Sequence, residues 1–229
     1  MTVPRPYLDR LPYARQPNAW LLAALLALVL LYPFLQEHSG GRAAIAIFDL
    51  AILMLALRAS QAGGGERQFG YVLVVPAMVL HVAAAFTPVH PLILLSLAAQ
   101  ALFHGFVVIC LLRYMLRDDV MTLDELFAAA ALYVLMAFVF AYLYAMVELQ
   151  YPGAFLINPV NNPDGVVGWW ELLYFSFTCL TSVGFGEVTP VSDHARSLVM
   201  IEEMLGVLYF ALVISRLVAL QATRVRAAR

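Results

Sequence analysis

Long apolar runs separated by short polar stretches dominate this chain of 229 residues. Six runs are long enough to cross roughly 30 Å of hydrocarbon as helices. They cover about 18–36, 43–58, 70–87, 91–113, 126–147 and 197–220. A further apolar run, 168–180, is too short to span and predicts a re-entrant helix, which is stable at membrane depth where protein surrounds it. The pattern predicts an all-α membrane protein with six transmembrane helices and one re-entrant helix.

Composition and charge agree with this prediction. With 63% hydrophobic and 12% charged residues, the chain is excluded from the ordinary soluble proteins. All thirteen basic residues are arginines, and if both termini are cytoplasmic only Arg42 and Arg196 lie outside. We therefore expect a multi-pass protein of a plasma or inner membrane with both termini inside. A net charge of −2 gives no reason to expect a nucleic-acid partner.

One short motif carries the candidate chemistry. The run that ends near residue 180 continues as Thr181-Ser182-Val183-Gly184-Phe185-Gly186. Glycine adopts at little cost the backbone conformations that aim neighbouring carbonyls the same way. Such carbonyls can replace the hydration shell of a potassium ion. A Gly-x-Gly triplet alone usually marks a tight turn, but its place between a short aromatic helix and a long apolar run favours a selectivity filter.

From Trp169 to about Leu220 the chain resembles the two-span pore domain of tetrameric potassium channels, as found in bacterial six-span channels. The resemblance implies a filter of Thr181 to Gly186, with K⁺ bound at Ser182, Val183, Gly184 and Phe185. It also implies support for the filter from the pore helix and the flanking carboxylates. The implied support residues are Tyr174, Phe175, Thr178, Glu187 and Glu203, with Glu203 bonded to the pore helix behind the filter. For any one aromatic residue, simple packing in the core or against lipid is the alternative.

The motif departs from the family pattern at three positions. Ser182 replaces threonine, Phe185 replaces tyrosine and Glu187 replaces aspartate. Each change weakens lateral bracing, so we predict a filter that is prone to inactivation.

Gly206 lies in the last span, 22 residues after Gly184, and resembles the hinge glycine of the inner helix. A glycine inside a helix costs about 1 kcal/mol, so it needs a reason. Close packing between helices is the alternative reason. With Gly206 as hinge, Val207, Phe210 and Ile214 share one face and are candidates for the cavity lining and the gate.

The chain divides into a four-helix domain, 1–120, and a pore domain, 121–229. Thr122 and Glu125 predict a capping box at the start of the fifth span. The four-helix domain resembles a voltage sensor without gating arginines, because the fourth span has only Arg113, at its inner end. An unrelated four-helix module is the alternative.

Asp49, in the second span, is an intramembrane acid for which Gln100 and His104 are candidate partners. A structural hydrogen bond is the alternative to a functional role. The candidate pH-sensing histidines are His81, His104 and His194.

One filter loop cannot surround an ion, so a chain with a single pore element predicts a homotetramer. The expected function is passive K⁺ conduction without strong voltage gating, without catalysis and without a cofactor beyond the ion. The expected partners are three further copies of the chain, membrane lipids and K⁺. A weakly selective cation channel, a non-conducting sensor or accessory subunit, and a transporter subunit are the alternatives.

Overall fold

The computed structural model describes residues 16–36, 41–59, 64–117, 122–160, 162 and 165–227. These residues form seven helices and two short strands. In chain order they are α1 (Pro17–Gln36), α2 (Gly41–Ala59), α3 (Gly64–Phe86), α4 (His90–Arg117), α5 (Leu123–Gln150), β1 (Phe155–Ile157), α6 (Trp169–Leu180), β2 (Val188–Pro190) and α7 (Asp193–Ala227).

Five of these helices, α1, α3, α4, α5 and α7, are long and apolar enough to cross a membrane. The second helix, α2, is not among them, because its nineteen residues include Arg42, Asp49 and Arg58. The structure thus shows a mostly helical, multi-pass membrane protein, and the sixth span stays a prediction. The short strands β1 and β2 depart from the expected all-α fold.

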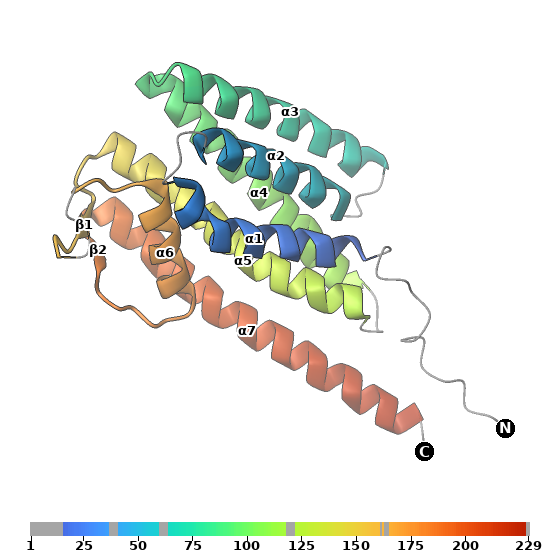
Figure 1. Cartoon of the computed structure of the whole chain (residues 1–229). Coiled ribbons are helices and arrows are strands. Elements are labelled where there is room, and N and C mark those ends of the chain that lie inside the picture. The colour runs from blue at the N-terminus through green and yellow to red at the C-terminus, as the bar shows by residue number, and fades with distance from the viewer. Residues whose placement is uncertain are drawn as a thin grey trace.

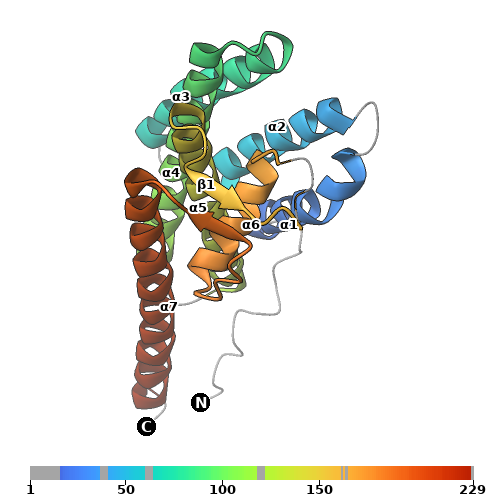
Figure 2. The ribbon, with the colours of Figure 1, turned by 90° about the vertical axis from the view of Figure 1, so that its left-hand side faces the viewer.

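Helix α5 occupies the centre of the molecule and is buried along most of its length. Helices α1 and α4 pack against it, and α6 and α7 also contact it. The two ribbon views place α7 and α3 at opposite edges of the molecule (Figures 1 and 2). One apolar core joins α5 to α1 and α4, and a second joins α5 to α6, β1, β2 and α7. Helix α5 therefore contributes to both cores.

The predicted capping box at the start of α5 is confirmed. The Thr122 hydroxyl accepts a hydrogen bond from the Glu125 amide (3.3 Å), and the Glu125 carboxylate accepts one from the Thr122 amide (2.9 Å). Two of the amides that a helix start leaves unpaired are satisfied in this way.

Strands β1 and β2 pair antiparallel, with Phe155 opposite Pro190 and Ile157 opposite Val188. Neither strand was predicted from the sequence. Strands of three residues are too short to give a periodic signal, so their pairing follows from tertiary contacts. This ladder brings the chain before α6 next to the chain after the candidate filter (Figure 1).

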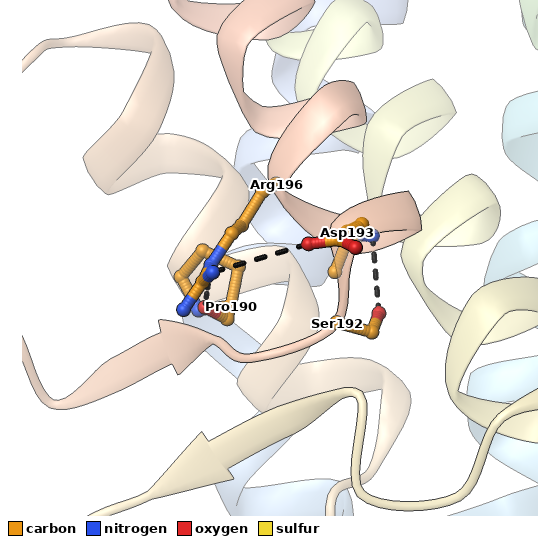
Figure 3. A network of polar contacts seen from close by, with 5 residues as sticks. Pro190, Ser192, Asp193 and Arg196 are labelled. Carbon is orange, nitrogen blue, oxygen red and sulfur yellow. Dashed lines mark hydrogen bonds and ion pairs between the residues drawn. The ribbon is translucent and has the colours of Figure 1, made fainter.

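The start of α7 is fixed by a small polar network (Figure 3). The Arg196 side chain donates to the Pro190 carbonyl (3.3 Å) and lies 4.0 Å from the Asp193 carboxylate. The Ser192 hydroxyl accepts from the Ala195 amide (3.2 Å), as an N-capping residue does. These contacts join the end of β2 directly to the first turn of α7.

Candidate ion-conducting site

Helix α6 begins at Trp169, where the predicted re-entrant helix was expected. The Gly168 amide donates to the Glu171 carboxylate (3.0 Å) at its start. At its end, the Thr181 amide still bonds to the Phe177 carbonyl (3.1 Å). The carbonyl end of a helix carries partial negative charge, which favours a cation beyond it. Helix α6 thus directs its negative end toward the segment that begins at Thr181.

The backbone of this segment has a regular alternation. Ser182, Gly184 and Gly186 have positive φ angles of 56°, 55° and 76°, whereas Val183 and Phe185 between them do not. Positive and negative φ angles therefore alternate along the segment, and both glycines occupy positive-φ positions, which glycine adopts at little cost. The positive φ of Ser182 was not predicted, and it costs roughly 1–2 kcal/mol in a residue with a Cβ atom.

Thr178 holds the start of this segment. Its carbonyl accepts hydrogen bonds from the Val183 amide (3.0 Å) and the Gly184 amide (3.3 Å), while its hydroxyl donates to the Phe175 carbonyl (2.7 Å). The amides therefore face α6, and the candidate filter is attached to the end of that helix through its backbone.

The segment is uncovered on its other side. All six residues from Thr181 to Gly186 are exposed, Val183 by 54% and Phe185 by 67%. A Cβ atom added at Gly184 or Gly186 would meet no atom within 4 Å. Large exposed apolar side chains on an irregular segment call for a covering partner.

Only one of the two predicted supporting aromatics lies against this segment. The Tyr174 ring is parallel to the Phe185 ring, with centroids 6.5 Å apart, and the Tyr174 hydroxyl interacts with the Glu187 carboxylate. Phe175 instead packs against Tyr144 and Phe155, with centroids 5.4 and 5.6 Å away. Within the single chain Phe175 therefore shows core packing, the alternative that the sequence left open: consecutive helical residues point in directions about 100° apart, and Phe175 faces α5 and β1.

The prediction that Glu203 bonds to the pore helix is wrong. Glu202 makes this contact: it is fully buried and accepts hydrogen bonds from the Ser176 hydroxyl of α6 and the Tyr144 hydroxyl of α5. Glu203 is exposed in the single chain. A carboxylate of α7 thus connects α5, α6 and α7, but it belongs to Glu202, the residue next to the predicted Glu203.

A pattern in the sequence could have distinguished the two glutamates. The buried positions of α7 are Ala195, Val199, Glu202 and Gly206, which follow the 4-3-4 spacing of one helix face. Glu202 fits this spacing and Glu203 does not. Ser176 and Tyr144 gave no signal, because hydroxyl-bearing residues are common in membrane helices.

The hydroxyl of Ser176 has two acceptors within reach. It lies 3.0 Å from the Ala137 carbonyl and also contacts the Glu202 carboxyl. A serine hydroxyl carries one proton, so it can donate to only one of them at a time. The three hydrogen bonds that join Glu202, Ser176, Tyr144 and the Ala137 carbonyl need three protons, and the two hydroxyls supply only two. A proton on Glu202 itself would supply the third.

The structure shows a packing reason for Gly206. A Cβ atom at this position would come within 2.4 Å of the Leu180 carbonyl oxygen, at the end of α6. Close packing of α7 against α6, the alternative that the sequence left open, therefore occurs at this glycine. A hinge function of Gly206 stays a prediction.

The three predicted gating residues are exposed in the single chain: Val207 by 58%, Phe210 by 48% and Ile214 by 58%. The Phe210 ring also packs against Tyr133 of α5, with centroids 5.0 Å apart. One side of Phe210 thus belongs to the contact between the inner and outer helices.

In the first four helices, Asp49 does not have the predicted partners. It lies 3.5 Å from the His81 ring of α3. His104 contacts the Gln100 carbonyl of its own helix (2.8 Å), and the Gln100 amide group has no hydrogen-bond partner among the described residues. The helical spacing of Gln100 and His104 placed them on one face, but the sequence could not show that α3 would reach Asp49 first.

The His194 ring at the start of α7 stacks on the Tyr151 ring, which follows α5, with centroids 4.6 Å apart.

The region described above, from α5 to α7, is also the part of the chain that is similar to known proteins. Residues 126–221 match the family described as "Ion channel". Over 55 residues, 24% of this chain, the sequence is 34% identical to the potassium channel protein Kcv of Paramecium bursaria Chlorella virus 1. The matched region covers 58% of that viral protein's length. The first four helices lie outside the family match. Over residues 126–221, the chain is therefore similar to ion channels.

Proposed function

We propose that this protein is a potassium-selective channel that conducts K⁺ passively across a membrane. In this proposal the carbonyls of Ser182, Val183, Gly184 and Phe185 replace water around the ion. The region with the family match contains all the elements that this needs: an outer helix α5, a pore helix α6, a filter segment and an inner helix α7.

One observation carries the proposal. Positive φ recurs at every second residue, Ser182, Gly184 and Gly186, while the Thr178 carbonyl holds the amides of Val183 and Gly184. A single turn needs at most two residues of positive φ and no such repeat. The repeat supports the proposal that successive carbonyls face one side and form a row of ion sites.

The proposed assembly is a homotetramer. One chain supplies one filter segment, and a cage for a dehydrated ion needs four around an axis. The uncovered face of Thr181–Gly186 and the exposed apolar positions of α7 support contact with further copies. Lipid covers the remaining apolar surface, for example along α3.

The proposed channel is not strongly voltage-gated. A sensor needs about three to four charges per subunit that move through the field. Helix α4 has two arginines, Arg113 and Arg117, both in its last turns. The six-span topology with cytoplasmic termini, the hinge at Gly206 and the gate at Phe210 or Ile214 belong to the same proposal.

A weakly selective cation channel is the second candidate, because Ser182, Phe185 and Glu187 depart from the family pattern. The Tyr174–Phe185 contact favours it too, since a phenylalanine cannot donate a hydrogen bond to the surrounding helix.

The test is the reversal potential of the purified protein in planar bilayers, with K⁺ on one side and Na⁺ on the other. A value near the potassium equilibrium potential supports the proposal, and a value near zero supports the weakly selective channel. A tetramer that stays silent in the wild type and in Ile214→Asp, a change intended to make an exposed position of the proposed gate hydrophilic, would contradict both candidates.

A further inference from the structure

The first turn of the pore helix α6 packs against a helix outside the region of the family match. The Tyr32 ring of α1 is stacked on the Trp170 ring, with centroids 4.1 Å apart and planes 6° from parallel. The same ring lies 6.3 Å from the Trp169 ring. A tight parallel stack of this kind fixes both the position and the orientation of the two side chains.

Helix α5 completes this packing. The Trp169 ring contacts Phe138 and Tyr142 of α5, with centroids 5.5 and 5.4 Å away. The Trp169 ring nitrogen is buried and has no hydrogen-bond partner among the described residues. Among the described residues, Trp169 is therefore held in position by ring packing and by no side-chain hydrogen bond. We call Tyr32, Trp169, Trp170, Phe138 and Tyr142 the aromatic clamp.

Helix α4 also reaches the clamp. The His104 ring is buried, 5.2 Å from the Tyr142 ring and 6.1 Å from the Phe138 ring. Side chains of α1 and α4 thus both meet the rings that hold the start of α6.

Helix α1 is anchored a second time, near its first residues. The Asn18 backbone amide and side-chain amide donate to the Asp124 carboxylate of α5, at 3.2 and 2.6 Å. The Tyr114 hydroxyl of α4 donates to the same carboxylate (3.1 Å). Asn18 and Tyr32 are fourteen residues apart, which is about 21 Å along a helix. Helix α1 is therefore attached to the pore domain at two widely separated points.

We propose that α1 is a fixed brace for the pore helix and that Tyr32 is a positioning residue for the filter. Helix α6 has twelve residues, with the clamp at its first turn and Thr178 near its last. Because the Thr178 carbonyl holds the Val183 and Gly184 amides, a tilt of α6 moves the filter backbone. The four-helix domain then acts on conduction by holding α6 in place, which needs no moving charge.

This inference rests on the proposed function, and its test separates the two. The full-length channel is compared in bilayers as wild type, Tyr32→Phe and Tyr32→Leu, by single-channel open probability and reversal potential. Tyr32→Phe keeps the stacked ring and is expected to behave as wild type. Tyr32→Leu removes the stack and is expected to change the open probability roughly two- to tenfold, the factor that an aromatic pair is worth. Trp20→Leu is the matched control, since Trp20 lies on the same helix, is 58% exposed and is in no ring pair among the described residues.

Two further measurements keep the result unambiguous. If Tyr32→Leu does not assemble, Trp170→Phe reduces the stacked area from the other side. The melting temperature of the tetramer shows whether a variant only loses stability. A selective wild-type channel whose Tyr32→Leu and Trp170→Phe variants keep the open probability of Trp20→Leu would overturn the brace. A wild type that fails the reversal-potential test overturns the proposed function instead.

Discussion

Gly206 of α7 lies directly against the carbonyl group of Leu180, the last residue of α6. There is no room between them for a methyl group. This contact joins α7, which would carry the proposed gate, to α6, whose Thr178 holds the candidate filter segment. It also gives the most direct test of the pore region.

Gly206→Ala is expected to destabilise the protein, because a Cβ atom 2.4 Å from a backbone oxygen forces α7 and α6 apart. Overpacking of this kind costs about 1–3 kcal/mol. Gly105→Ala in α4 is the control: its Cβ meets no atom within 4 Å, so it should stabilise the helix by up to about 1 kcal/mol. Thermal unfolding in detergent measures both. Equal melting temperatures for the two variants would contradict the close contact.

Glu202→Ala is expected to lower the free energy of unfolding by about 1–3 kcal/mol, because the hydroxyls of Ser176 and Tyr144 then lose their shared partner in a buried site. Glu203→Ala should change it by less than about 0.5 kcal/mol in the unassembled chain, where Glu203 is exposed. The measurement is chemical unfolding of the detergent-solubilised monomer. A larger effect at Glu203 would restore the assignment that the sequence suggested.

Glu202 is expected to be protonated in the folded protein, since only then do Ser176 and Tyr144 and the Ala137 carbonyl all have partners. Infrared difference spectra should show a protonated carboxyl band that disappears in Glu202→Gln and persists in Glu203→Gln. A spectrum identical in wild type and Glu202→Gln in this region would mean that the serine proton is shared between two acceptors.

Gly184→Ala and Gly186→Ala are expected to abolish selective conduction, because both glycines have positive φ and an alanine there costs roughly 1–2 kcal/mol in every chain. Gly153→Ala is the matched control. Gly153 has a φ of 85° and equally open surroundings, but it lies in the loop between α5 and β1. Bilayer recordings of the three variants should show K⁺ current only for Gly153→Ala. Loss of current in all three would indicate that backbone strain alone unfolds the protein.

Asp49→Asn is expected to destabilise the four-helix domain, because the partly buried His81 ring then loses the carboxyl group that lies 3.5 Å from it. Single substitutions at Asp49 and His81 should each cost roughly 1–3 kcal/mol, and the double substitution should cost less than their sum. A cycle of Asp49 with His104 serves as control and should be additive. Coupling to His104 in place of His81 would support the partner that the sequence suggested.

Much of the pore region could be predicted because its signals are local. The apolar run 168–180, the two glycines after it and the capping box at Thr122 each depend on neighbouring residues, and α6 and the box are where they were expected. The contacts of Asp49, Phe175 and Glu202 depend on which helix packs nearby. Spacing along one helix indicates a face, but it does not show which partner that face meets.

The pairing of Phe155 with Pro190 has a consequence for engineering this protein. The ladder holds together the two ends of a chain segment that contains the whole of α6 and the candidate filter. Both ends of this segment therefore meet the rest of the fold at one place, the β1–β2 pair. The corresponding segment of a relative, grafted between β1 and β2, would need to match only these two strands and the surfaces of α5 and α7 that face it.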